Sequence, residues 1–238
     1  MSSTEQFTRA RTGLAPLNGK IPYSLTLGNH DTGAVCQGGS ACPGTNTNIA
    51  VRDTTAFNKA FPLTSFTTIT GAYEPGKVDN TYTTFTAAGQ KWMMLNLELW
   101  PRQGAIDWAR KIITTHTDHN VIIATHSYLN SDGTISTSNG GYGATSPKHL
   151  FDTLIKTSPN VQMVLSGHTG TAATRTDTAT DGHKIVSYLQ TYHSRTTNPV
   201  RLITLDTTKG TATTRVYAPR TQETLLPETT ITAFTFTR

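Results

Sequence analysis

The chain has 238 residues, a length that one domain with a single large core can accommodate. Hydrophobic residues make up 35% of it and charged residues 15%, with many Thr and 19 Gly, a composition more typical of a secreted globular protein than of a cytosolic one. The net charge of +5 is scattered without a Lys/Arg block, and no apolar run approaches the about 20 residues of a membrane span, so we expect neither a nucleic-acid partner nor a membrane span.

The first quarter of the chain is predicted to contain two helices, one strand and two loops. Apolar residues at helical spacing predict a helix over Thr4–Leu17, and β-prone residues predict a strand over Ile21–Leu27. The loop Gly28-Asn29-His30-Asp31 leaves the carboxyl end of that strand. A loop rich in Gly, Cys and Asn follows over 34–48, and a short helix is predicted over Thr54–Ala60. Ligand-binding groups concentrate in loops that follow strands of α/β sheets.

The middle of the chain alternates strands with helices, and the last quarter contains strands alone. Hairpin signals, buried apolar runs and one apolar stripe predict strands over Thr81–Ala87, Trp92–Leu97, Val121–Thr125 and Val161–Leu165, and helices over Gln103–Thr117 and Pro147–Thr157. Further strands are predicted over Ile185–Gln190, Val200–Asp206, Thr211–Tyr217 and Ile231–Phe236. The pattern predicts a single α/β domain over 1–238 with a β-rich carboxyl-terminal part.

Two cysteines flank a Gly-rich stretch, Cys36 and Cys42. A zinc site would need more Cys or His ligands nearby, and none follows Cys42 at a suitable spacing. A disulfide that closes a small loop is the favoured interpretation, with two free thiols as the alternative. The sequence at the amino terminus, Met-Ser-Ser-Thr-Glu-Gln-Phe, does not have the pattern of a signal peptide.

Three predicted strands each end in a small polar turn that carries a histidine: His30, His126 and His168. Taken singly, each histidine is best interpreted as a hydrogen-bonded polar residue at a strand end. If the strands are parallel neighbours, their carboxyl ends converge, and Asn29, His126 and His168 can offer one oxygen and two nitrogens to a divalent cation. His30 would then stand beside the metal, with Asp31 placed to orient its ring.

Such an arrangement suits the hydrolysis of phosphate esters. A divalent cation polarises phosphoryl oxygens, and a nearby imidazolium can protonate the leaving alkoxide. Two metal ions about 3.5–4 Å apart would stabilise both the attacking and the leaving oxygen.

In this order and at these separations, the three motifs resemble the later motifs of calcineurin-like metallophosphoesterases. Further stretches resemble secreted actinobacterial members of that family: Pro22-Tyr23-Ser24, Thr125-His126-Ser127-Tyr128-Leu129, Arg201-Leu202 and Val216-Tyr217. The resemblance covers nearly the whole chain. It implies an αββα sandwich with a dinuclear centre of the Mn, Fe or Zn class between two sheets, a secreted monomer and a small phosphoester substrate. It also implies that Asn29, His126 and His168 bind the second metal, and that His30 and Asp31 are the catalytic histidine and its carboxylate partner.

The sequence departs from the family pattern in two places. No Asp-x-His strand and no Gly-Asp strand precede Gly28, and Gly170 stands where a further ligand of the first metal belongs. We therefore expect at most one metal site, and expect that Met1 is an internal residue of a longer protein that contains the missing strands. Three function classes follow: a metal-dependent phosphoesterase, an impaired pseudoenzyme or binding module with the same fold, and a Thr-rich adhesive β protein.

Four other residues are interpreted as structural. His193 is predicted to be a strand histidine rather than a site residue. Trp92, Trp100 and Trp108 are predicted to pack in the core or at its rim rather than to form a sugar-binding platform.

Overall fold

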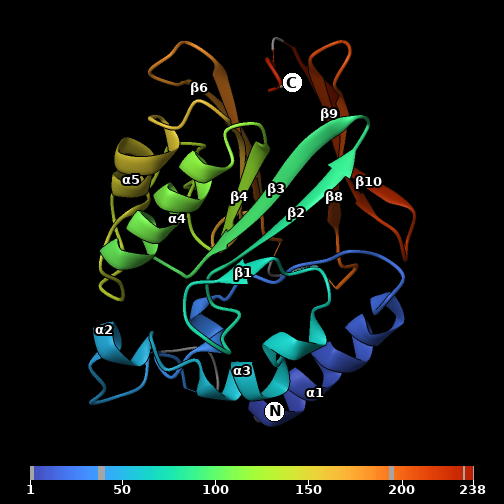
Figure 1. Ribbon diagram of the computed structural model, residues 1–238. Coiled ribbons are helices and arrows are strands. Elements are labelled where there is room, and N and C mark those ends of the chain that lie inside the picture. The colour runs from blue at the N-terminus through green and yellow to red at the C-terminus, as the bar shows by residue number, and fades with distance from the viewer. Residues whose placement is uncertain (1–2, 37–40, 193–195, 233, 238) are drawn as a thin grey trace.

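Four parallel strands run through the centre of the molecule: β3 (Gln90–Leu97), β4 (Asn120–Thr125), β5 (Val161–Ser166) and β7 (Lys184–Gln190). Figure 1 labels β3 and β4. This computed structural model describes residues 3–36, 41–192, 196–232 and 234–237. The central strands are mostly buried along their length, as strands covered on both faces are. The predicted strands over Trp92–Leu97, Val121–Thr125, Val161–Leu165 and Ile185–Gln190 are confirmed.

Antiparallel strands extend this sheet at both edges to seven strands, in the order β1-β2-β3-β4-β5-β7-β6. On one side, β2 (Thr81–Ala87) pairs with β3 as the predicted hairpin, and the short β1 (Gly71–Ala72) pairs with β2. On the other side, β6 (Ala172–Thr178) pairs with β7. The strand β6 was not predicted, because its sequence is polar and its residues are half-buried or exposed.

Helices cover one face of the large sheet. They are α4 (Gln103–Thr115), α5 (Pro147–Leu150) and the π-helical segment η4 (Phe151–Ile155). In α4 the apolar stripe of Ile106, Ala109 and Ile113 is buried against Leu95, Val121 and other core residues. The predictions of helices over Gln103–Thr117 and Pro147–Thr157 are therefore confirmed, although the second begins as an α-helix and continues as a π-helix.

A small antiparallel sheet covers the opposite face, with β9 (Thr211–Ala218) between β8 (Val200–Asp206) and β10 (Glu223–Ile231). Trp92, Met163 and Tyr188 of the large sheet share a core with Ala212 of β9 and Phe234. The β-rich carboxyl-terminal part is thus confirmed. The predicted strand over Ile231–Phe236 is wrong, because the strand is β10 and ends at Ile231, while the rings of Phe234 and Phe236 stack with centroids 5.5 Å apart.

The amino-terminal residues form a helical layer at one end of the molecule (Figure 1). It contains α1 (Ser3–Leu14), η1 (Ala15–Leu17), α2 (Thr47–Ala50), α3 (Thr55–Ala60) and η3 (Leu63–Ser65). Phe7 of α1 packs edge-on against Phe57 of α3, with ring centroids 5.7 Å apart. The helices predicted over Thr4–Leu17 and Thr54–Ala60 are confirmed.

The strand predicted over Ile21–Leu27 is wrong. These residues belong to no sheet in the structure. Their apolar side chains still contribute to the core, since Leu27 is buried in a cluster with Phe57 and Val78. An apolar β-prone stretch becomes a strand only where a neighbouring strand pairs with its backbone. Across the described ranges, no helix is long and apolar enough to cross a membrane.

Candidate metal centre

Adjacent parallel strands bring two of the predicted ligands together. β4 ends one residue before His126, and β5 ends two residues before His168. Toward their carboxyl ends Ile123 pairs with Val164 and Ala124 with Leu165, and the Gly167 N–H donates to the His126 carbonyl oxygen at 2.9 Å. As a result, Nδ1 of His168 lies 3.2 Å from Nε2 of His126, and both side chains are half-buried.

The turn that carries Asn29 lies against one of these two histidines, His126. A 3-10 turn, η2 (Asn29–Asp31), follows Gly28, whose N–H donates to Oδ2 of Asp31 at 2.8 Å. A Cβ atom on Gly28 would lie 2.7 Å from Cε1 of His126. Such a contact is too close for a carbon atom, so glycine is the residue that lets this turn approach the imidazole.

The side-chain amide of Asn29 provides the test of whether a metal ion fits. Its Oδ1 is buried, and no hydrogen-bond donor in the described chain reaches it. A buried acceptor without a donor costs about 1–3 kcal/mol, so a cation in front of this oxygen would be stabilising. One amide oxygen and two imidazole nitrogens suit divalent ions of the Mn, Fe or Zn class. In residues 3–36, 41–192, 196–232 and 234–237, this site included, no three His, Cys, Asp or Glu side chains form a group that could hold a metal ion, so the candidate set depends on the amide of Asn29.

The predicted catalytic pair lies on the same turn. His30 is exposed and Asp31 is half-buried. Burial raises the pKa of the Asp31 carboxyl, while the Gly28 N–H and the charge of His30 oppose that rise. Asp31 therefore closes the turn through its hydrogen bond to Gly28 and also acts electrostatically on His30.

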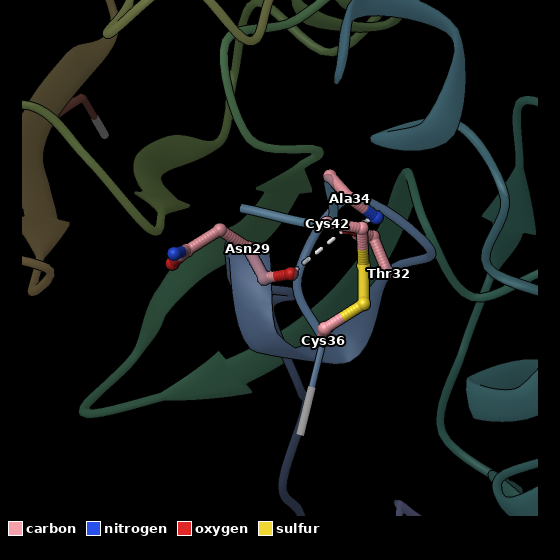
Figure 2. Close-up of a disulfide and its surroundings, with 5 residues drawn as sticks. All are labelled: Asn29, Thr32, Ala34, Cys36 and Cys42. Carbon is pink, nitrogen blue, oxygen red and sulfur yellow. Dashed lines mark hydrogen bonds between the residues drawn. A yellow bond between two sulfur atoms is a disulfide. The ribbon is translucent and has the colours of Figure 1, made fainter. Parts of the chain in front are cut away.

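A disulfide is linked to this turn by hydrogen bonds. Cys36 and Cys42 are bonded, with Cα atoms 4.9 Å apart, which confirms the predicted pairing. The Cys42 N–H donates to the Ala34 carbonyl oxygen at 3.1 Å, and the Ala34 N–H donates to Thr32 Oγ1 at 3.2 Å. Thr32 Oγ1 donates in turn to the Asn29 carbonyl oxygen at 2.8 Å (Figure 2). In Figure 2 the Asn29 side chain projects away from the disulfide.

A cavity of about 270 Å³ opens beside His126, and its remaining walls are Thr26, Ala124, Thr125, Leu165, Ser166, Gly167 and Gln190. It lies at the carboxyl ends of the parallel strands, where ligands of α/β sheets bind. A larger cavity of about 540 Å³ is lined by Arg110 and Asn160 at the opposite ends of the strands, and none of the predicted site residues lines it. We assign the smaller cavity to the site because it is the one in contact with a candidate ligand.

Sequence reasoning missed a polar network behind the histidines. Trp100 was correctly expected to be buried, but it also packs edge-on against His168, with ring centroids 5.6 Å apart. Nearby, the buried carboxylate of Glu98 forms ion pairs with Arg52 at 3.2 Å and Arg102 at 2.9 Å. Burial by itself would raise the pKa of Glu98, but the hydrogen bonds from Arg102 and the charge of Arg52 hold it below its ordinary value. The positions of Glu98 and Trp100 in the sequence could have indicated this network, because both residues closely follow β3, as the histidines follow β4 and β5.

Residues 4–171 match the sequence model of a family described as calcineurin-like phosphoesterase. The chain belongs to the calcineurin-like phosphoesterase family. The resemblance stated from the motifs is thereby confirmed, and so is the α/β fold with an added antiparallel sheet. Members of this family are metal-dependent phosphoesterases.

Two individual proteins are similar to this chain. The uncharacterized protein YvnB of Bacillus subtilis (strain 168) is 29% identical over 164 residues, which are 68% of this chain and 11% of YvnB. The structure of NAD nucleotidase (NadN) from Haemophilus influenzae is similar over 64% of this chain and 30% of that chain, at 10% identity and a TM-score of 0.33. At so low a TM-score, the similarity gives no information about the activity of this chain. The remaining histidine considered from the sequence, His193, lies outside the described residues.

Proposed function

We propose that this chain hydrolyses small phosphate mono- or diesters with a divalent metal ion held by Asn29, His126 and His168. The observation that carries the proposal is the meeting of two imidazole nitrogens, 3.2 Å apart, at the ends of neighbouring parallel strands. The turn of Asn29, whose buried amide oxygen has no donor among the residues that the structure describes, lies against one of those rings. When bound, the cation would supply Lewis-acid stabilisation of charge on the phosphoryl oxygens.

His30 is the proposed general acid. Its side chain is exposed, so a substrate phosphoester can reach it, and it adjoins the proposed ligand Asn29. An imidazolium at this position can donate its proton to the leaving alkoxide. Asp31 attracts that imidazolium, and its hydrogen bond to Gly28 keeps the carboxylate in place.

Metal binding without turnover is the alternative function, and one observation favours it. Gly170 stands where the sequence pattern of the family has a further ligand. Its φ is +66°, and a Cβ atom there would lie 2.6 Å from Cβ of Ser131. The backbone therefore has no room for a histidine at this position, which supports a single metal ion rather than two.

One experiment separates these two functions. Purified chain is freed of metal, reloaded with Mn²⁺ or Zn²⁺, and assayed with p-nitrophenyl phosphate and bis-p-nitrophenyl phosphate, while bound metal is measured by mass spectrometry. Hydrolysis that disappears in His30→Asn while bound metal is retained supports the phosphoesterase. His149→Asn is the matched control, because His149 contacts Gln103 at the start of α4 rather than the site. Bound metal without hydrolysis in the unmodified chain supports the binding module.

Localisation and assembly are also proposed. The disulfide supports an oxidising, extracellular location, because reducing compartments keep such pairs open. A monomer acting on a small molecule, rather than on nucleic acid, is the assembly we propose. Sedimentation of the purified chain tests the monomer, and a dimer at micromolar concentration would contradict it.

A further inference from the structure

Trp100 contacts one of the candidate metal ligands, His168. Its side chain is 3% exposed, and its ring meets the His168 ring at an angle of 85°. Its backbone has φ of +43°, in the left-handed region that bulky residues avoid. A bulky residue keeps such a conformation only where the surrounding contacts hold it there.

Arg52 supplies polar contacts to the backbone of Trp100, whose ring also packs against Tyr142. Its Nη2 donates to the Trp100 carbonyl oxygen at 2.6 Å, and its Nη1 donates to the Leu99 carbonyl oxygen at 3.0 Å. The same Nη1 lies 3.2 Å from Oε1 of Glu98. One guanidinium therefore binds three consecutive residues of the segment that follows β3.

Glu98, the ion-pair partner of Arg52, is itself held by several hydrogen bonds. Its carboxylate accepts hydrogen bonds from the backbone N–H, Nε and Nη2 of Arg102, at 2.8 to 2.9 Å. It also accepts one from the Asn80 amide at 3.1 Å. A buried carboxylate with this many donors has a single orientation, and charge-assisted hydrogen bonds are about twice as strong as neutral ones.

Hydrogen bonds also connect the backbone near this ion pair to the segments that carry Asn29 and His126. The Thr125 hydroxyl, next to His126, donates to the Glu98 carbonyl oxygen at 3.4 Å. The Gly33 N–H, on the segment that follows the Asn29 turn, donates to the carbonyl oxygen of Asp53, the neighbour of Arg52, at 2.9 Å.

We infer that Arg52, held by Glu98, is a positioning residue that keeps Trp100 against His168 and so sets the affinity of the site for its metal ion. The inference rests on the proposed function. Arg52 acts through Trp100 rather than by touching the metal. Lysine cannot replace it, because a single ammonium group lacks the planar set of donors that bonds two carbonyl oxygens and a carboxylate together.

The test compares Arg52→Lys with the unmodified full chain. Zn²⁺ and Mn²⁺ affinities are measured by calorimetry, and the imidazole resonances of His126 and His168 are recorded in the metal-free protein. We expect affinity to fall at least about tenfold, the lower end of what residues behind metal ligands contribute. We also expect the His168 resonances to move. Arg110→Lys is the matched control, because Arg110 also pairs with a carboxylate, Asp107 at 2.8 Å, and donates to a carbonyl oxygen, that of Thr153 at 2.8 Å, but does so on α4.

A second substitution keeps the inference testable if Arg52→Lys does not fold. Trp100→Phe retains an aromatic ring beside His168, so we expect it to keep the fold, to shift the same His168 resonances and to weaken metal binding. Unchanged resonances and unchanged affinity in a folded Arg52→Lys or Trp100→Phe protein would overturn the positioning role. If the unmodified chain binds neither metal, the proposed function fails, and the metal-free resonances alone then decide whether Arg52 positions His168.

Discussion

Gly28 shows how one residue without a side chain determines the distance between two parts of the candidate site. The turn of Asn29 can approach His126 only because no Cβ atom projects into the imidazole. Neighbouring Asn29 offers its amide oxygen from that turn, and the two imidazoles come from strand ends. The ligand geometry therefore depends on a position that cannot itself bind a metal ion.

Gly28→Ala is predicted to weaken metal binding more than it weakens the fold. A methyl group placed 2.7 Å from Cε1 of His126 must push the turn and the ring apart. Overpacking of this kind costs about 1–3 kcal/mol of stability. We expect a metal affinity at least about tenfold lower, measured by calorimetry, in a protein that still unfolds cooperatively. Gly13→Ala is the control, since Gly13 lies in α1 with open space around it and without a positive φ. Equal affinities for Gly28→Ala and the unmodified chain would contradict this account.

At the scale of elements, the site combines two kinds of segment that are held in different ways. β4 and β5 are central strands fixed by pairing on both sides, so the positions of His126 and His168 follow from the sheet. The Asn29 turn has no strand before it, because Ile21–Leu27 is unpaired in the structure. That turn relies on local hydrogen bonds and on the disulfide loop instead.

Opening the disulfide is predicted to loosen the Asn29 turn. The hydrogen bonds from Cys42 to Ala34, from Ala34 to Thr32 and from Thr32 to Asn29 link the bridge to the proposed ligand. In Cys36→Ser/Cys42→Ser we expect faster hydrogen exchange of the Thr32 and Ala34 amides and weaker metal binding. The loss of stability should be at or below the typical 2–4 kcal/mol, because the closed loop is short. Unchanged exchange at both amides would rule out the proposed link.

At the scale of the whole molecule, the alternation of strands and helices in the middle of the chain was predictable, because strands buried on both faces and an amphipathic helix leave clear patterns. The convergence of His126 and His168 followed from that alternation. The pairing of β6 with β7 and that of β10 with β9 could not be predicted, since β6 and β10 are largely polar or exposed. The role of Arg52 also could not be predicted, because its three contacts join segments 46 to 48 residues apart along the chain.

The ion pairs of Glu98 with Arg52 and Arg102 predict how the stability of the whole protein depends on pH. The pKa of Glu98 is lowered in the folded protein, so its contribution to the free energy of unfolding is complete above its ordinary pKa of 4.5. The contribution is lost as pH falls through the lowered, folded-state pKa. Urea unfolding at pH 7 should show Glu98→Gln to be about 3–5 kcal/mol less stable, because Arg52 loses its buried partner. The difference should shrink toward pH 3, and a constant difference would show that Glu98 does not titrate on unfolding.

The contact between Gly170 and Ser131 limits how this scaffold could be engineered toward a second metal ion. Introducing histidine at 170 alone would drive its Cβ into Ser131, whereas Ser131→Gly alone would supply no ligand. Both substitutions would be needed to place a further ligand at position 170, and the positive φ would still disfavour any side chain at that position. A laboratory selection for two-metal activity that changes one residue at a time would therefore first have to accept a variant that is worse than, or no better than, its parent.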